Sequence, residues 1–153
     1  MKISSNMIEA HIFRINNRKI EFLLLKRNSN EIYPNIWQMV NGKIKKNEKA
    51  FETALREIYE ETNLKPEKLW VVPNINQFYS YEKNYISVIP VFAALVNKNS
   101  NVIISKEHCR FKWVSDSGAK KMLAWEGQRK SVELIVKYYL KEINFLNLVE
   151  IKI

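Results

Sequence analysis

The chain has 153 residues, of which 46% are hydrophobic and 27% charged, and its formal net charge is +9 at pH 7. This composition excludes a disordered chain and is typical of one globular domain with a buried core, so we expect a single domain over residues 1–153. No apolar run reaches the roughly 18 residues of a membrane-spanning helix, so no membrane partner is expected. The basic residues are spread along the chain, so their charge alone predicts no nucleic-acid partner.

The only cysteine is Cys109, which rules out an internal disulfide and suits a reducing compartment. Residues 1–6 lack the apolar core of a signal peptide. The sequence therefore predicts a cytoplasmic protein in which Cys109 is a small buried hydrophobic residue.

The first half of the chain alternates strands with one helix. Strand patterns cover residues 8–14 and 20–25, and a short strand over 37–40 ends at Asn41-Gly42. A helix is expected over 48–62, with Asn47 as its N-cap. Asn63 and Pro66 are expected to close that helix.

The second half of the chain is dominated by strand patterns and ends in a helix. The predicted strands are residues 69–72, 76–81, 86–96, 102–104 and 111–114. Ser115 or Asp116 caps a short helix, and residues 127–142 form a last amphipathic helix. Strands around a central helix, followed by a terminal helix, predict an α/β fold with a mixed sheet between helices.

The central helix carries the strongest chemical signal. Its predicted core-facing stripe consists of Phe51, Ala54, Leu55, Ile58 and Thr62. On the opposite side, Glu57, Glu60 and Glu61 are three and four residues apart, so they can converge on one point. Like charges at this spacing repel, and a bound cation is the usual reason to keep them together. Arg56, one turn from Glu60, can orient a carboxylate.

Carboxylates without cysteine or histidine suit Mg²⁺ or Mn²⁺ rather than zinc. Magnesium keeps some of its waters and is usually shared with substrate phosphates. Gly42 allows a tight turn that could present a backbone carbonyl to the same site. The alternative for these carboxylates is a solvated acidic helix face.

A longer pattern spans residues 42–64 and reads Gly42-x5-Glu48-x7-Arg56-Glu57-Ile58-x-Glu60-Glu61-x-Asn63-Leu64. It resembles the Nudix box, G-x5-E-x7-R-E-U-x-E-E-x-G-U, in which U is aliphatic. The only departure is Asn63 in place of glycine, and asparagine is the next-best residue for a left-handed helix cap. The resemblance implies a Nudix hydrolase with an α/β/α sandwich around a central mixed β-sheet.

The resemblance also implies roles for residues in and after the box. The implied ligands of Mg²⁺, with Mn²⁺ as the alternative ion, are Gly42, Glu57, Glu60 and Glu61. Glu48 and Arg56 would brace the loop and the helix. The general base varies in this family, and it could be a glutamate of the box or a carboxylate of a later loop. Glu107 is the candidate for the latter, with a plain surface charge as its alternative.

The segment Glu107-His108-x-x-Phe111-x-Trp113-Val114 is most similar to the branch of dATP and dihydroneopterin-triphosphate pyrophosphohydrolases. This similarity implies a small-molecule substrate, a nucleoside or pterin triphosphate, that is cleaved to a monophosphate and pyrophosphate. Many Nudix proteins are dimers, so the resemblance also allows a homodimer.

Other activities remain as alternatives. Tyr81 lies about where dinucleoside polyphosphate hydrolases carry a tyrosine, whereas Val40 stands where that group usually has proline. A catalytically silent Nudix-fold module that binds nucleotides or RNA would suit the basic charge, but it has no reason to keep three repelling carboxylates. An ADP-ribose pyrophosphatase and an isopentenyl diphosphate isomerase fit less well, because a downstream proline and a cysteine before the box are absent.

Several residues outside the box could contact the substrate. Arg27 follows an apolar strand and could bind a phosphate bidentately, or lie free on the surface. Trp37 and Gln38 could stack on and read a base, although Trp37 fits the core better. Tyr81 could line the pocket. The residues expected to be structural are His11, His108, Trp113, Trp125 and the stripe from Val132 to Tyr139.

Overall fold

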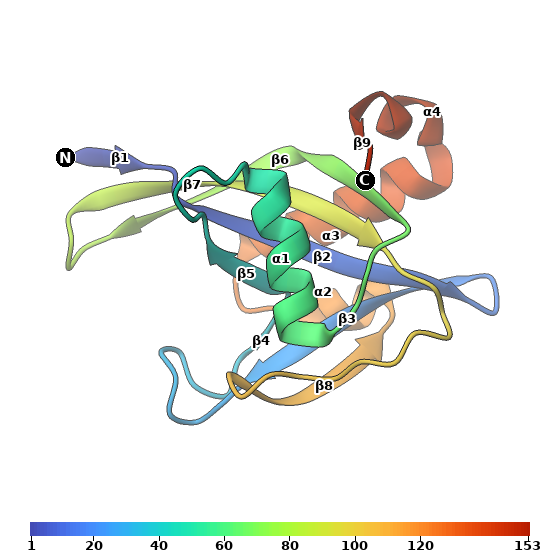
Figure 1. The fold of residues 1–153 in the computed structure, drawn as a ribbon, viewed down its shortest axis with the longest axis horizontal. Coiled ribbons are helices and arrows are strands. Elements are labelled where there is room, and N and C mark those ends of the chain that lie inside the picture. The colour runs from blue at the N-terminus through green and yellow to red at the C-terminus, as the bar shows by residue number, and fades with distance from the viewer.

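The computed structural model describes residues 1–153, which form one β-sheet flanked by helices (Figure 1). The strands are β1 (Lys2–Ser4), β2 (Met7–Asn16), β3 (Lys19–Arg27), β4 (Trp37–Gln38), β5 (Val40–Lys43), β6 (Lys68–Ser80), β7 (Tyr85–Leu95), β8 (His108–Val114) and β9 (Glu150–Ile151). The helices are α1 (Ala50–Thr62), α2 (Asp116–Met122), α3 (Glu126–Lys141), α4 (Ile143–Leu146) and a 3-10 turn, η1 (Asn147–Val149).

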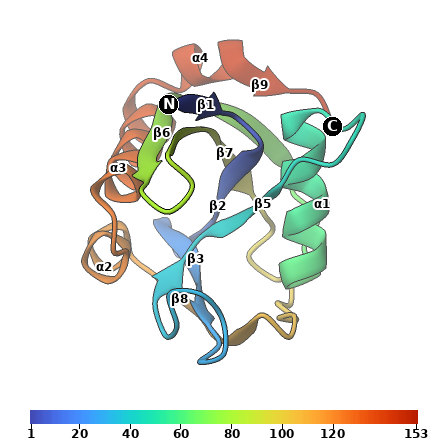
Figure 2. The same ribbon diagram turned by 90° about the vertical axis from the view of Figure 1, so that its left-hand side faces the viewer.

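The sheet is mixed. Its main path runs β4-β3-β2-β7-β6-β9, with β5 paired to β2, β8 to β3 and β1 to β7. The β2–β7 and β1–β7 pairs are parallel, and the other pairs are antiparallel. Helix α1 covers one face of the sheet, while α2 and α3 cover the other (Figure 2). The predicted α/β fold with a central mixed sheet is confirmed. No helix in the structure is both long and apolar enough to cross a bilayer.

Alternation along the strands builds one core on each side of the sheet. On β2, Ile8 and Ile12 point to the α1 side and join the core that contains Ile58 of α1. Phe13 points to the other side and joins Val132 of α3. Successive residues of one strand therefore serve opposite faces of the molecule.

Helix α1 matches the predicted stripe, because Ala54, Ile58 and Thr62 are buried. Asn63 follows the helix in the left-handed conformation, with φ 61°, as predicted for the helix cap. The predicted N-cap is wrong. Lys49 occupies that position, and Asn47 lies two residues earlier in a turn with φ 66°. A left-handed Asn47 cannot be an N-cap, which needs extended backbone.

The predicted tight turn at Gly42 is also wrong. Gly42 lies inside β5, pairs with Ile8 and has no positive φ. A Cβ atom added to Gly42 would lie 2.3 Å from Cδ of Glu57. Glycine is therefore needed because the Glu57 side chain passes directly over the strand, and not because the backbone turns there.

Four further expectations differ from the structure. Residues 102–104 form no strand, because Ile103 donates its backbone N–H to the carbonyl of Thr62 at the end of α1 instead (2.9 Å). Cys109 is exposed, since its neighbour His108 takes the inward position on β8. Trp125 is half exposed at the start of α3 and is not a core residue. The predicted strands 69–72 and 76–81 are joined into β6, with a bulge between Val71 and Ile75.

Candidate active site

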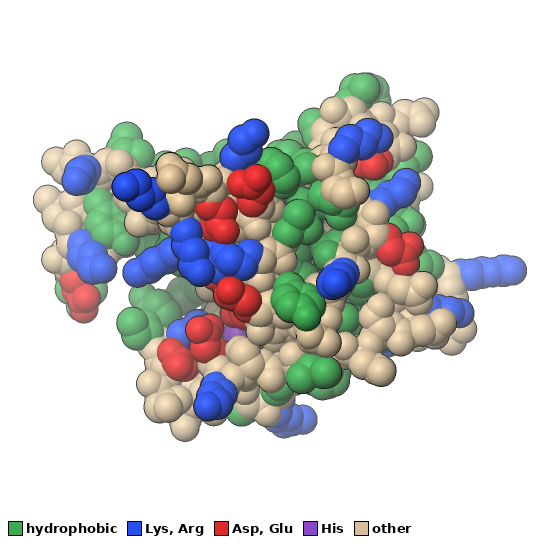
Figure 3. Space-filling view, in the orientation of Figure 1, with side chains coloured by type: hydrophobic (Ala, Val, Ile, Leu, Met, Phe, Trp, Pro, Cys, Tyr) green, Lys and Arg blue, Asp and Glu red, His purple; other side chains and the backbone are tan.

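Arg56 is the centre of a charge network over α1. Its Nε and Nη2 donate to the two oxygens of Glu48 at 2.8 and 3.0 Å, and Nη2 also donates to the carbonyl of Lys43. Its Nη1 donates to Glu57 at 2.6 Å and to Glu60 at 3.2 Å. Figure 3 shows acidic and basic side chains side by side over the region of α1. The guanidinium fork thus ties the loop before the helix to the outward carboxylates.

This network sets the charge of Glu48. The hydrogen bonds from Arg56, and then that from Thr53, lower the pKa of Glu48 to about 2. Glu48 in turn accepts the backbone N–H of Lys45 at 3.1 Å, which closes the loop before α1. Glu48 therefore stays ionised and holds Arg56 in one orientation.

The three box carboxylates differ in burial. The Glu60 side chain is half exposed, Glu57 is mostly covered, and Glu61 is buried with only 3% of its surface exposed. The sequence predicted all three on the outward face, but Glu61 points beneath the loop that follows β7. Burial, followed by the nearby charges of Glu57 and Glu107, raises the pKa of Glu61 to about 9. Burial also raises the pKa of Glu57, against the opposing effect of Arg56.

Glu61 meets two residues from beyond the box. Ligand atoms of Glu61, Glu107 and His108 all lie within 4.8 Å of one another. Oε2 of Glu61 and Nδ1 of His108 are buried and have no hydrogen-bond partner. The sequence predicted His108 as a structural residue. Its approach to Glu61 was missed, because the sequence around His108 does not indicate which helix strand β8 will face.

The backbone fixes Glu107 beside the helix. Ser105 donates its N–H to the carbonyl of Glu61 at 3.3 Å, which docks the loop on the end of α1. Asn28 donates its backbone N–H to the carbonyl of Glu107 and its side-chain amide to that of Lys106. The Glu107 side chain itself is exposed. Glu107 is therefore held in place by its backbone, with its carboxylate open to solvent.

Arg27 and Gln38 also belong to this site. Arg27 pairs with His108 across β3 and β8, and its charge lowers the pKa values of both Glu61 and His108. Burial is the larger cause for His108 and brings its pKa to about 4. Gln38 is buried and lies 3.0 Å from Nε2 of His108. These contacts keep the imidazole neutral and fix its ring.

Two predicted substrate contacts lie apart from this cluster. Trp37 packs against the core on the α3 side of the sheet, with Arg110 over its ring at 6.0 Å. Tyr81 follows β6 at the hairpin turn and is 79% exposed. Neither residue is brought to the carboxylates in this structure.

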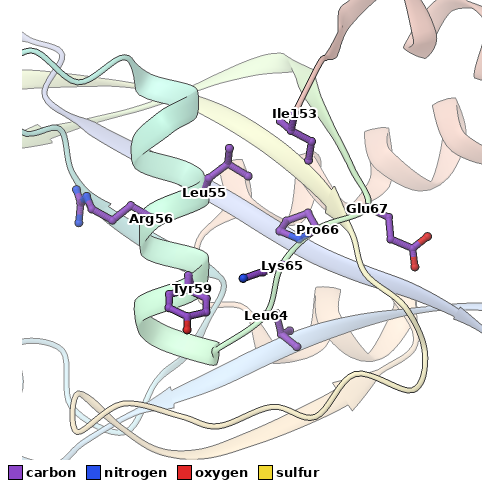
Figure 4. Close-up of a pocket in the computed structure, with 8 residues that line it drawn as sticks. All are labelled: Leu55, Arg56, Tyr59, Leu64, Lys65, Pro66, Glu67 and Ile153. Atoms are coloured by element: carbon purple, nitrogen blue, oxygen red, sulfur yellow. The ribbon is translucent and has the colours of Figure 1, made fainter.

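A cavity of about 440 Å³ lies beside α1, away from the carboxylate cluster. The cavity is lined by residues of α1, by the segment Leu64–Glu67 and by Ile153, and Figure 4 shows the Arg56 side chain extending away from that segment. The carboxylates of Glu57, Glu60 and Glu61 do not line it. The cavity therefore lies between α1 and the chain that follows it, and it meets the charge network only at Arg56.

The donor set fits a divalent cation. A buried carboxylate oxygen with no partner, a second carboxylate and an imidazole meet at one point, and further carboxylates lie along α1. Carboxylate oxygens are ligands for Mg²⁺ and Mn²⁺, whereas imidazole also suits transition metals. Burial, and then repulsion by Glu57 and Glu107, disfavour the ionised form of Glu61, and a cation at this point would favour it.

A family model and two curated relatives were found to be similar to this chain. The NUDIX domain model matches residues 6–135. A bis(5'-nucleosyl)-tetraphosphatase (asymmetrical) of Rattus norvegicus is 28% identical over 122 residues, covering 78% of this chain and 81% of that protein. The Caenorhabditis elegans protein of the same name is 31% identical over 103 residues, covering 67% of this chain and 72% of that protein.

A solved structure shares the fold. The crystal structure of a NUDIX hydrolase from Listeria monocytogenes aligns with a TM-score of 0.75 at 24% identity, over 88% of this chain and 93% of that one. The expected dATP and dihydroneopterin-triphosphate branch is not confirmed, because the two curated relatives carry the tetraphosphatase name.

Proposed function

Because this chain belongs to the NUDIX family, we propose that it hydrolyses a phosphoric anhydride bond of a nucleoside polyphosphate with the help of a divalent cation. The observation that carries this proposal is the meeting of Glu61, Glu107 and His108 beside the carboxylates of α1. A polyphosphate is an anion that this acidic site would repel on its own, and a shared cation reverses that repulsion. Mg²⁺ is the proposed ion, with Mn²⁺ as the alternative.

The proposed reaction assigns separate tasks to the side chains. Glu57, Glu60, Glu61 and the carbonyl of Gly42 would hold the cation, which when bound polarises a phosphoryl oxygen and makes water more acidic. Arg56 keeps Glu57 and Glu60 in place through its 2.6 and 3.2 Å hydrogen bonds. Glu107 would accept the proton of the attacking water as the new P–O bond forms and the anhydride P–O bond breaks. Arg27 would bind a phosphate oxygen.

A dinucleoside tetraphosphate is the proposed substrate. Its support is the name shared by the curated relatives of rat and nematode, at 28% and 31% identity. Asymmetrical cleavage of such a molecule gives one nucleoside triphosphate and one nucleoside monophosphate.

A nucleoside or pterin triphosphate, cleaved to a monophosphate and pyrophosphate, is the second candidate. It is favoured by the position of the Glu107-His108 pair at the cluster and by Val40, which stands where tetraphosphatases usually carry proline. The two candidates differ in their products, so one assay separates them.

The test is a product analysis with Mg²⁺ on diadenosine tetraphosphate, the four common nucleoside triphosphates, dihydroneopterin triphosphate and ADP-ribose. We expect ATP and AMP from diadenosine tetraphosphate, and a loss of at least about a hundredfold in kcat for Glu57→Gln. Glu52→Gln is the matched control. Glu52 lies on the same helix, and its carboxylate accepts a hydrogen bond only from the backbone N–H of Lys49 at the start of that helix. Absence of turnover on every compound, with Mn²⁺ also tried, would contradict the proposal.

The role of Glu107 needs two readouts, because it lies close to both the cation site and solvent. If Glu107 is the general base, Glu107→Gln lowers kcat by about a hundredfold or more, while the affinity for Mg²⁺ stays within about threefold. Mg²⁺ affinity is measured by calorimetry without substrate. A large loss of Mg²⁺ affinity would instead make Glu107 a ligand, and an unchanged kcat would remove it from the reaction.

A further inference from the structure

Strand pairing brings Gln38 and His108 together on one face of the sheet. Strands β4 and β8 both pair with β3, where Gln38 is opposite Leu25 and His108 is opposite Arg27. Residues that are directly opposite each other, or two apart on one strand, point to the same face. Leu25 belongs to the core on the α1 side. Both Gln38 and His108 therefore lie on the face that α1 covers, and both are buried.

A bulge in β8 turns the imidazole to this face. Along β8, Arg110 is opposite Lys26 and His108 is opposite Arg27, so Cys109 is an extra residue without a partner on β3. In a regular strand Cys109 would be opposite Arg27 and would present its thiol to the α1 side. The thiol instead lies 3.7 Å from the carbonyl oxygen of Lys26, and Cys109 is exposed. The bulge thus places a nitrogen ligand near the carboxylates and keeps the sulfur away from them.

Gln38 already uses the imidazole nitrogen that lies near Glu61. Nε2 of His108 is 3.8 Å from Oε1 of Glu61, and the side-chain nitrogen of Gln38 is 3.0 Å from the same Nε2. The side chain of Asn41 donates to Oε1 of Gln38 at 3.3 Å, which orients the amide so that its N–H donates to Nε2. This orientation assigns the ring proton to Nδ1, which has no partner. The opposite orientation would use Nε2 as well, because Nε2–H would then donate to the amide oxygen.

The Glu61 carboxylate keeps a free position for a cation beside this imidazole. Oε2 of Glu61 is buried and accepts no hydrogen bond, and ligand atoms of Glu61, Glu107 and His108 lie within 4.8 Å of one another. Imidazole suits Ni²⁺ and Zn²⁺, whereas Mg²⁺ prefers oxygen ligands. Sites with nitrogen ligands also bind Ni²⁺ more tightly than Mn²⁺. A free imidazole at this position would therefore favour transition metals over Mg²⁺.

We propose that Gln38 determines which cation the site accepts, by keeping the imidazole of His108 out of the ligand set. The cation is then held by oxygen atoms alone, which suits Mg²⁺ and Mn²⁺. This inference rests on the cation site of the proposed function. It deepens that function, because it assigns the metal preference to a residue that is not itself a ligand.

The test measures metal binding without substrate. The probes are Mg²⁺ and Ni²⁺ by calorimetry, and Mn²⁺ by pulsed EPR, which detects nitrogen bound directly to the ion. In Gln38→Met, a side chain of similar length cannot donate to Nε2. We expect Ni²⁺ affinity to rise about tenfold or more, while Mg²⁺ affinity stays within about threefold of the wild-type value.

The Mn²⁺ spectrum gives a readout that a purely structural role of Gln38 would not change. We expect no bound nitrogen in the wild-type protein and a histidine nitrogen in Gln38→Met. His11, the only other histidine of the chain, is buried on the α3 side of the sheet, so this signal reports His108. Gln38→Met/His108→Phe should lose the signal and return Ni²⁺ affinity to the wild-type value, because the gain needs the imidazole.

Two further variants control for effects on packing. Asn41→Ala removes the hydrogen bond that orients Gln38 at a position that is partly exposed, so its folding is not in question. It should raise Ni²⁺ affinity by a smaller factor than Gln38→Met, and it decides the outcome if Gln38→Met does not fold. Gln128→Met is the matched control, since Gln128 is also buried but donates to Glu9 on the α3 side. Its metal affinities should equal those of the wild-type protein.

Three results would overturn the inference: a histidine nitrogen bound to Mn²⁺ in the wild-type protein, an unchanged Ni²⁺ affinity in Gln38→Met, or no binding of Mg²⁺ and Mn²⁺ in any variant. Failure of the proposed function gives a different result. In that case no polyphosphate is hydrolysed, while the dependence of metal preference on Gln38 is still measured, because these experiments contain no substrate.

Discussion

At the scale of single residues, the site depends on the contact between Gly42 and Glu57. The Glu57 carboxylate lies across β5 because Gly42 has no side chain, and Arg56 fixes its Oε1 at 2.6 Å from Nη1. A helix carboxylate is thereby held against the backbone of a strand. Neither the helix nor the strand could position this group alone.

Gly42→Ala should therefore remove activity without unfolding the protein. The new methyl group would meet Glu57 at a distance that real structures do not allow, so the carboxylate must rotate away from the site. We expect kcat to fall by about a hundredfold, because a displacement of about 1 Å in a reacting or metal-binding group can reduce the rate by that factor. Circular dichroism should stay unchanged. The control is Gly118→Ala, whose Cβ would lie at 3.3 Å from Ser115 and Val114; equal activity losses in the two variants would contradict the prediction.

At the scale of elements, α1 ends because Asn63 adopts the left-handed conformation. Its backbone N–H donates to the carbonyl of Tyr59 at 2.8 Å, and the chain then turns toward Leu64, which is buried. The turn directs residues 64–67 back across the helix, and Thr62 and Glu61 remain free to accept hydrogen bonds from the loop that carries Glu107. The cap at Asn63 thus helps to set the position of Glu107, which lies more than forty residues further along the chain.

Two substitutions at Asn63 should show whether its backbone conformation or its side chain stabilises the end of α1. Asn63→Ala should lower the free energy of unfolding by about 1 kcal/mol, because a Cβ disfavours the left-handed region and alanine lacks the local polar compensation of asparagine. Asn63→Gly should stay within about 0.5 kcal/mol of the wild-type protein or exceed it. Urea denaturation at pH 7 measures both. A glycine variant less stable than the alanine variant would show that φ does not govern this position.

At the scale of the whole molecule, each face of the sheet buries a different pair of titratable side chains. The α1 side holds Glu61 and His108, and the α3 side holds Glu9 and His11. His11 is 1% exposed, and burial lowers its pKa to about 3. The folded protein therefore keeps His11 neutral at pH values at which the unfolded chain would protonate it.

This difference makes stability depend on pH. Below pH 6.5 the unfolded chain binds a proton at His11 and the folded protein does not until about pH 3, so stability is lost as pH falls through that window. The expected contribution is about 1.4 kcal/mol per pH unit below 6.5. Urea denaturation at pH 7, 6 and 5 should show that His11→Gln loses less stability than the wild-type protein over this range. Parallel losses in both proteins would contradict the prediction.

The sequence by itself determined the α/β fold class, helix α1 and the spacing of its carboxylates. These features are local. Helical periodicity places Ile58 on the core face, and Asn63 ends the helix through its own left-handed backbone. The pattern over residues 42–64 also predicted the family, which the domain match confirms. The roles of the site residues remain predictions that the experiments above address.

Only the tertiary structure decided which residues meet. The burial of Glu61, its approach to His108 and the contact of Gln38 with that imidazole depend on strand pairing and on the docking of loops, which join segments far apart in the chain. Gly42 shows the difference most clearly. Its place in the pattern was evident, but its physical role is to make room for a helix side chain, and that contact exists only once β5 packs against α1. Local periodicity reports the face on which a residue lies, and the fold alone decides what that face contacts.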